Sequence, residues 1–349
     1  MSLTQIAVLT KQVITISIIA TFLAIGSFIG YKIWYAYYLA HLPPKEEKPD
    51  TKFGRLPPPN FPQASVSSSN FSYSIDTTTG GLPKVGVDKG FEKLIKVYFV
   101  VKTYASLLSP EKSQNLAEKF DLKVNPQIIS ETNYIFKDKD KTLNIDLDSG
   151  NFTYLNEATI SATSTLDDET KLVTDFKAML GNIGILKPDL NSGRTKIGLL
   201  RNDNGKFTPS DLKNEASGAQ ISLWPASLDN KPIVTAKFNT SYVNATVFKS
   251  ASDIQTYLSL NFIYYQIDTS TFATYPLRPS EQAFEDLKSG NGIIVIEPPK
   301  ANVSITSVYL GYFLSENYSP YLLPVYIFEG PNFAAYALAI SPEFQSQTK

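Results

Sequence analysis

The most regular feature in the distribution of apolar residues is an uncharged run near the N-terminus. Residues 13–31 contain nineteen consecutive positions without a charged side chain. A helix of that length spans roughly 28 Å, close to the ~30 Å hydrocarbon core of a bilayer. Tyr31 ends this run and four more aromatic residues follow, as is typical of a membrane–water interface: Trp34, Tyr35, Tyr37 and Tyr38. We therefore predict a transmembrane helix with an aromatic belt over residues 13–40, preceded by a cytoplasmic N-terminus, residues 1–12.

Two other interpretations of this run fit less well. A cleaved signal peptide has a shorter apolar region, and bulky Tyr38 would stand three positions before the only suitable cleavage point, Ala40. A buried core helix normally has a polar face, which this run lacks. Within the run, Gly26 and Gly30 form a G-x-x-x-G spacing that permits close helix–helix contact, although such spacings are common by chance in apolar segments.

A proline-rich and serine-rich segment separates this helix from the rest of the chain. Seven prolines lie between residues 43 and 69 and end in a serine cluster. Proline disfavours helix and central strands, so we predict an extended linker over residues 41–69.

Beyond residue 70, helical and strand patterns alternate. Helices are predicted from Ser109 as N-cap to about residue 121, from Thr165 to Gly181 or Gly184, and from Ser280 to Gly290. Strands are predicted over residues 82–86, 94–103, 133–136, 142–147, 151–155, 219–223, 233–239, 244–249 and 258–268, and in four segments after residue 292. One helix followed by antiparallel strands recurs about three times. The predicted fold class is therefore α+β, with helices on one face of antiparallel sheets, a first domain over residues 70–160 and a second over 161–349.

The amino-acid composition excludes several classes of function. The chain has 33 acidic and 32 basic residues, one His and no Cys. Thiol nucleophiles, disulfides and Cys/His zinc sites are excluded, and the balanced charge gives no basis for nucleic-acid binding. Lys and Arg near the two ends of the apolar run do not decide its orientation. A Cys-free region rich in Ser, Thr, Tyr and Asn favours a single-pass cell-membrane protein with its N-terminus inside and its C-terminal domain outside the cytoplasm.

The last seventy residues resemble a known family group. The stretch SEQAFEDLKSG (residues 280–290), then VYLGYF (308–313) and LLPVYIFEG (322–330), is similar to the PepSY-like group, and most similar to membrane-anchored bacterial regulatory proteins of the YycI and YycH type. This resemblance implies a single-pass protein whose outer α+β domains hold, inhibit or modulate another envelope protein, with no catalytic residues. The divergent middle region and the long linker do not match the pattern.

The residues themselves indicate no catalytic, metal or cofactor site. Two Ser-x-x-Lys spacings occur, Ser109–Lys112 and Ser210–Lys213. Both are predicted to lie at helix N-cap positions, where the Ser caps and the Lys is solvated, whereas a Ser/Lys hydrolase needs a buried neutral Lys. The fragment DLDSGN at residues 146–151 is too short for a calcium-binding loop, and we predict a hairpin turn there. There is no phosphate-binding glycine motif.

Three hypotheses about function remain. The leading one is a non-enzymatic protein that binds and regulates or scaffolds another envelope or membrane protein. The second is a receptor for cell-wall carbohydrate or peptide, in which loop residues Tyr318 and Tyr321 form an exposed aromatic surface. The third is a hydrolase with a carboxylate pair that is not recognisable from the sequence.

Overall fold

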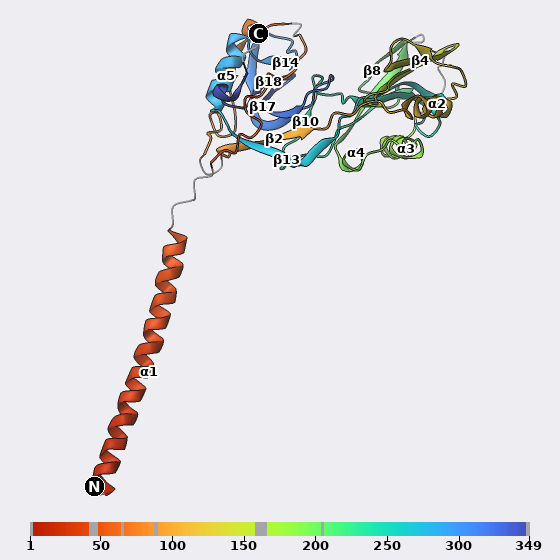
Figure 1. Ribbon diagram of the computed structural model, residues 1–349. Coiled ribbons are helices and arrows are strands. Elements are labelled where there is room, and N and C mark those ends of the chain that lie inside the picture. The colour runs from red at the N-terminus through yellow and green to blue at the C-terminus, as the bar shows by residue number, and fades with distance from the viewer. Residues whose placement is uncertain are drawn as a thin grey trace. The chain divides into compact units, whose positions relative to one another are not determined.

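The computed structural model describes residues 3–41, 48–63, 66–86, 90–157, 166–203 and 206–346. The chain forms two compact units, residues 1–48 and residues 49–349 (Figure 1). Its class is α+β: one N-terminal apolar helix is followed by largely antiparallel sheets and a few helices, as the sequence predicts.

The first unit is the helix α1 (Leu3–Ala40). Its segment Val13–Leu39 is long and apolar enough to cross a membrane, and its side chains are exposed all round. The hydroxyls of Thr15 and Thr21 donate to the carbonyls four residues earlier, so their polar groups are satisfied within the helix. The predicted aromatic belt lies on the last turns of this helix, where Trp34 stacks on Tyr38 with ring centroids 5.7 Å apart. An apolar surface on every side of a helix is stable in lipid and unfavourable in water.

The largest of the three sheets in the second unit has nine strands. In order across the sheet they are β3 (Gln127–Ile128), β4 (Asn133–Asp138), β5 (Lys141–Asp146), β6 (Phe152–Asn156), β12 (Tyr257–Phe262), β11 (Val243–Phe248), β9 (Gly218–Leu223), β7 (Thr195–Asp203) and β8 (Lys206–Pro209). All the pairings are antiparallel. The predicted meander over residues 133–155 is confirmed as β4–β5–β6.

One face of this sheet is buried under helices, and side chains alternate accordingly. The helices are α2 (Ser109–Lys119), α3 (Glu169–Asn182) and α4 (Pro188–Ser192) (Figure 1). They share one core with the strands, to which α3 contributes Leu172 and Phe176. On β6, Phe152 and Tyr154 point into that core, whereas Thr153 and Leu155 are exposed on the opposite face. The period of two along a strand explains this division.

The second sheet has seven strands and collects segments that are distant in sequence. They are β2 (Leu94–Val100), β10 (Ile233–Val234), β13 (Ile267–Pro276), β14 (Ile293–Ile296), β16 (Ser307–Phe313), β17 (Tyr321–Gly330) and β18 (Phe333–Leu338). A parallel pair, β1 (Ser72–Ile75) with β15 (Asn302–Ile305), stands apart. The helix α5 (Ser280–Ser289) packs Ala283 and Leu287 into the core of this sheet and ends at Gly290, whose φ of 93° only glycine adopts readily.

The sheets do not divide the chain at residue 160. The strand β6 pairs with β12 in the nine-stranded sheet, and β2 pairs with β13 and β17 in the seven-stranded sheet. A boundary between residues 160 and 161 therefore separates strands that are hydrogen-bonded in both sheets. That position also lies within residues 158–165, outside the described residues.

Part of the predicted linker belongs to the folded unit. Leu56 is 1% exposed within the core of the seven-stranded sheet, and the Phe61 ring packs against Phe313 at 4.8 Å. The backbone N–H of Leu56 donates to the carbonyl of Phe344. The prediction of an extended linker over residues 41–69 is therefore wrong for residues 49–63. Apolar side chains between the prolines of this segment pack into the folded unit.

Several predicted element boundaries are wrong for local reasons. Leu108 occupies the N-cap position of α2, and Ser109 is its first residue. The cap of α3 is Asp168, which accepts the N–H of Thr170 at 3.0 Å; Thr165 lies outside the described residues. The strand expected over residues 82–86 is a single bridge at Val85. Only Ile233–Val234 of the segment 233–239 pairs as a strand, because the hydroxyl of Thr235 bonds to the carbonyls of a following turn.

Candidate functional site

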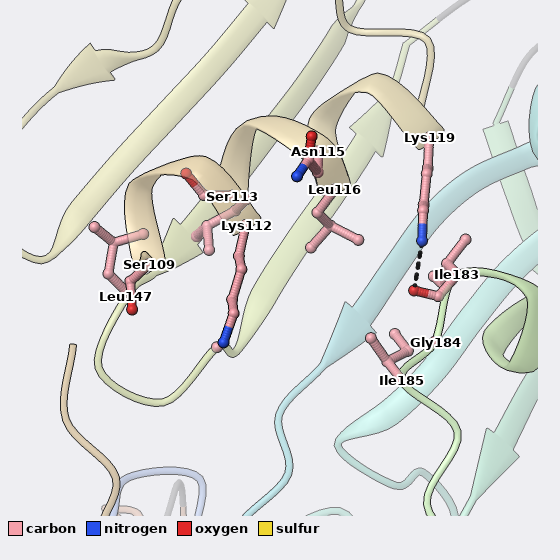
Figure 2. Close-up of a pocket in the computed structure, with 12 residues that line it drawn as sticks. Ser109, Lys112, Ser113, Asn115, Leu116, Lys119, Leu147, Ile183, Gly184 and Ile185 are labelled. Carbon is pink, nitrogen blue, oxygen red and sulfur yellow. Dashed lines mark hydrogen bonds between the residues drawn. The ribbon is translucent and has the colours of Figure 1, made fainter. Parts of the chain in front are cut away.

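A pocket of about 370 Å³ lies beside α2, between this helix and the segment that follows α3 (Figure 2). Its walls come from three places: the exposed side of α2, the β5–β6 turn and the C-terminal end of α3. The lining residues are Ser109, Lys112, Ser113, Asn115, Leu116, Lys119, Ile145, Leu147, Gly150, Ile183, Gly184 and Ile185. Most of the lining surface is apolar, so the pocket suits an apolar group.

Local sequence explains how these walls are held. The Ser113 hydroxyl donates to the carbonyl of Pro110 at 2.6 Å, and buried Ala117 fixes the inner side of α2 against the core. In the β5–β6 turn, the Asp146 carboxylate accepts the N–H of Asp148 and the hydroxyl of Ser149. The predicted hairpin turn at residues 146–151 is thus confirmed. After α3, Gly184 adopts a φ of 81° and turns the chain so that Ile185 faces the pocket.

The charged groups of the pocket are two lysines. Figure 2 shows Lys119 donating to the carbonyl of Ile183, a bond of 3.0 Å that also neutralises the exposed carbonyl end of α3. Lys112 is exposed and makes no ion pair or hydrogen bond with another described side chain. No carboxylate lines this pocket. An apolar group that carries a nearby negative charge therefore fits it best.

The loop before α2, residues 101–108, presents apolar side chains to solvent. Leu107 is 100% exposed, Tyr104 69% and Leu108 58%. The backbone of this loop is nevertheless held. The N–H of Ala105 donates to the Asp148 carboxylate at 2.8 Å, and the N–H of Ser106 donates to the hydroxyl of Ser109 at 2.9 Å. A fixed loop that exposes large apolar residues is typical of a contact surface.

The loop and the pocket form one continuous surface because they share residues. Ser109 both lines the pocket and holds the loop, and Asp148 lies between two lining residues, Leu147 and Gly150. We call the exposed side chains of Tyr104, Leu107 and Leu108 together with the pocket the α2 surface. Sequence reasoning missed it, although adjacent leucines in a short segment between a strand and a helix start are a visible signal.

The α2 surface has no Ser/Lys catalytic geometry. The Ser109 hydroxyl is engaged with Ser106, and Lys112 is solvent-exposed where a general base must be buried. The second Ser-x-x-Lys spacing lies in a turn and not at the predicted helix N-cap: the Ser210 hydroxyl accepts the N–H of Leu212, and Lys213 pairs with Asp168 at 3.1 Å. At both spacings the Ser hydroxyl forms local hydrogen bonds and the Lys lies on the surface.

The structure half-buries the two tyrosines that the sequence suggested as an interaction surface. Tyr318 donates its hydroxyl to the carbonyl of Val100 at 3.0 Å, and its ring meets Tyr265 edge-on at 5.8 Å. Burial raises the pKa of its hydroxyl. Tyr321 begins β17 and stacks on Phe53 at 4.8 Å. These rings hold segments of the second unit together.

The predicted helix-contact residues Gly26 and Gly30 lie one turn apart on exposed positions of α1. Within the unit, a Cβ at either position would meet nothing within 4 Å. Both positions are therefore free of contacts from this unit, as the close approach of a second helix would require.

A second pocket, of about 470 Å³, lies between α4 and β13. Its one carboxylate, Asp189, accepts the hydroxyl of Tyr264, which is 3.0 Å from both carboxylate oxygens. Burial, and then the adjacent Asp189, raise the pKa of Tyr264. A hydrolase of the predicted carboxylate-pair type needs a second acid here, and none of the described residues that line this pocket supplies one.

Neither a metal-ligand cluster nor a characterised relative identifies a function for this chain. No group of three or more Asp, Glu or His side chains could hold a metal ion within the ranges that the structure covers. No family model and no curated protein matches the sequence. A solved structure of an uncharacterized protein from Eubacterium rectale ATCC 33656 is similar at 12% identity, with a TM-score of 0.35, over 79% of this chain and 91% of that one. A likeness at this level assigns neither fold nor function.

Proposed function

We propose that this chain is a non-enzymatic, single-pass membrane protein that binds and regulates or scaffolds another envelope protein through the α2 surface. The folded unit, residues 49–349, would lie outside the cytoplasm and the N-terminus inside. The observation that carries the proposal is Leu107, which is fully exposed on a loop whose backbone is fixed by hydrogen bonds beside an apolar pocket.

The energetics of this surface support protein binding. Burying one leucine side chain contributes about 1.5–3 kcal/mol, so Leu107 and Leu108 with the Tyr104 ring could supply the centre of an interface. Since the loop is already ordered by Asp148 and Ser109, binding would not incur the cost of fixing it. The matching partner segment has an apolar side chain for the pocket and an acidic residue for Lys112.

The resemblance to PepSY-like membrane-anchored regulators suggests the same kind of role. By contrast, a wall-polymer receptor built on Tyr318 and Tyr321 has little support, because both rings pack inside the second unit. The partner is therefore sought at the α2 surface.

Site-specific photo-crosslinking tests this proposal in intact membranes. A photoreactive amino acid replaces Leu107 in the full chain, and the matched control replaces Leu212, a leucine of 54% exposure in the segment between β8 and β9. We expect a discrete crosslinked protein from position 107 and none from position 212. Lys112→Glu should weaken the crosslink at 107, because the acidic partner group would be repelled. The absence of a discrete product at 107, or the same products from both positions, would contradict the proposal.

A further inference from the structure

The face of the nine-stranded sheet opposite the helices carries a field of neutral polar side chains. Strand register places Asn144, Thr153 and Asn261 side by side on β5, β6 and β12. A second row, on β5, β12 and β11, contains Thr142, Ser259 and Thr246. Between Thr142 and Ser259 lies Leu155, which is 46% exposed. We call these six polar residues and Leu155 the polar face.

The six polar side chains of this face have no hydrogen-bond partner within the described part of the protein. No side chain among them bonds to another described residue, and none belongs to a packed core cluster. The contrast with the neighbouring end of the same sheet is clear. There, Asn244 donates to the carbonyl of Ser241 at 2.6 Å and is 6% exposed. The polar face is thus the part of this side that remains open to solvent.

The charge on this face is confined to its margins. On β5, β6, β12 and β11 the outward positions of the two rows are Asn, Thr, Ser and Leu only. Charged residues border them: Asp146 follows Asn144 on the outward side of β5, Lys137 stands on β4 at one side, and Lys196 stands on β7 at the other. Exposed sheet faces of soluble domains usually carry charged residues for solubility. A continuous neutral field with donors and acceptors therefore requires another explanation.

We propose that the polar face binds a neutral polysaccharide, with amide and hydroxyl groups bonding to sugar hydroxyl or N-acetyl groups. Asn side chains offer both donor and acceptor, and Thr and Ser hydroxyls can serve as either, which suits ligands that also carry both. Leu155 offers a central apolar contact for the C–H face of a sugar ring. Neighbouring strands are about 4.8 Å apart, close to the length of one sugar in an extended β-linked chain, so successive strands can meet successive sugars.

Other ligand classes fit this face less well. A nucleic acid requires several Lys or Arg residues to neutralise phosphates. Protein interfaces are enriched in aromatic residues and Arg, and a membrane surface requires a broad apolar face. The two rows contain neither aromatic nor basic residues. This inference does not depend on the α2 surface, which lies on the helix-covered side of the sheet.

Sedimentation with insoluble polymers tests the inference. The full chain is reconstituted in lipid nanodiscs, because sugar-headed detergents would compete, and is mixed with chitin, cellulose or, as an acidic comparison, calcium alginate. The test variant combines Thr153→Ala with Asn261→Ala, and the matched control combines Thr195→Ala with Asn302→Ala at exposed positions away from the polar face. Thermal unfolding of both variants checks that the fold is kept.

We expect the wild type and the control to sediment with chitin or cellulose and the test variant to bind about tenfold more weakly, as the loss of two hydrogen bonds predicts. Leu155→Lys should abolish sedimentation by placing a charge in the centre of the face. The inference is overturned if neither neutral polymer retains the protein, if alginate alone retains it, or if the test variant binds as well as the control. It is also overturned if the test variant turns a dimer into a monomer without any change in polymer binding, because the face would then contact a second copy.

Discussion

At the scale of single residues, Tyr318 and Tyr321 differ in what their hydroxyl groups do. The Tyr318 hydroxyl donates to the carbonyl of Val100, whereas that of Tyr321 bonds to none of the described residues. Tyr318→Phe should therefore lower the free energy of unfolding by about 1 kcal/mol, and Tyr321→Phe should leave it nearly unchanged. Urea unfolding followed by tyrosine and tryptophan fluorescence measures both. Equal effects of the two substitutions would show that the Val100 bond does not stabilise the fold.

The same two residues show why the sequence alone did not predict how these rings are packed. Tyrosines in a polar loop are equally compatible with an exposed surface and with rings that pack against distant segments. Phe53 and Tyr265, which contact Tyr321 and Tyr318, lie far from them in the sequence, so no local pattern connects them. Leu107 is the opposite case, an apolar residue that no described element of the structure covers, with an exposure of 100%.

At the scale of elements, Asp229 connects the loop between β9 and β10 to the strand β2. Its carboxylate is 3.1 Å from the Lys96 amino group and accepts the hydroxyl of Tyr98 at 2.5 Å. Burial would raise the pKa of Asp229, but the Tyr98 bond and then Lys96 outweigh it and hold the pKa below its ordinary value. A carboxyl whose pKa is lowered by folding stabilises the folded state above the unfolded pKa of about 3.9, and this contribution is lost as the pH falls through the lower folded value.

Asp229→Asn should consequently destabilise the second unit at neutral pH. Asn tolerates the φ of 48° at this position, so the substitution removes the charge with little backbone strain. Because the carboxylate is 36% exposed, solvent screening limits the expected loss to about 0.5–1 kcal/mol. Urea unfolding at about pH 7 and about pH 3 should show a difference from the wild type that shrinks at the lower pH. A difference that is constant or larger in acid would contradict this account of Asp229.

Helices and strands that depend on local sequence patterns could be predicted, but the pairing of strands distant in the sequence could not. The helix α5 ends at Gly290 because glycine alone adopts its φ readily, and the meander β4–β5–β6 follows from alternating residues and short turns. The strand β2, however, pairs with β13 and β17, which lie more than 160 residues further along the chain. The polar face also depends on register, because Thr153 and Asn261 become neighbours only when β6 pairs with β12. Such contacts are absent from any local window of sequence.

At the scale of the whole molecule, the two proposed binding surfaces lie on opposite sides of one sheet. The α2 surface belongs to the helix-covered side, and the polar face belongs to the open side. A protein partner and a polysaccharide could therefore be bound at the same time without competition. Together with a membrane helix, this arrangement would allow the chain to hold a membrane-associated partner close to a surface polymer.

The division into two compact units leads to a final expectation about the membrane helix. Since α1 is apolar on all sides and residues 49–349 have their own cores, the full chain should stay in the membrane pellet after alkaline carbonate extraction. A chain that begins at residue 49 should be soluble and unfold at the same temperature as the second unit of the full chain, because no core residue is removed. In intact cells, added protease should digest the folded unit and leave an N-terminal epitope tag protected. Release of the full chain by carbonate would refute the anchor, and digestion of the tag with protection of the folded unit would reverse the proposed orientation.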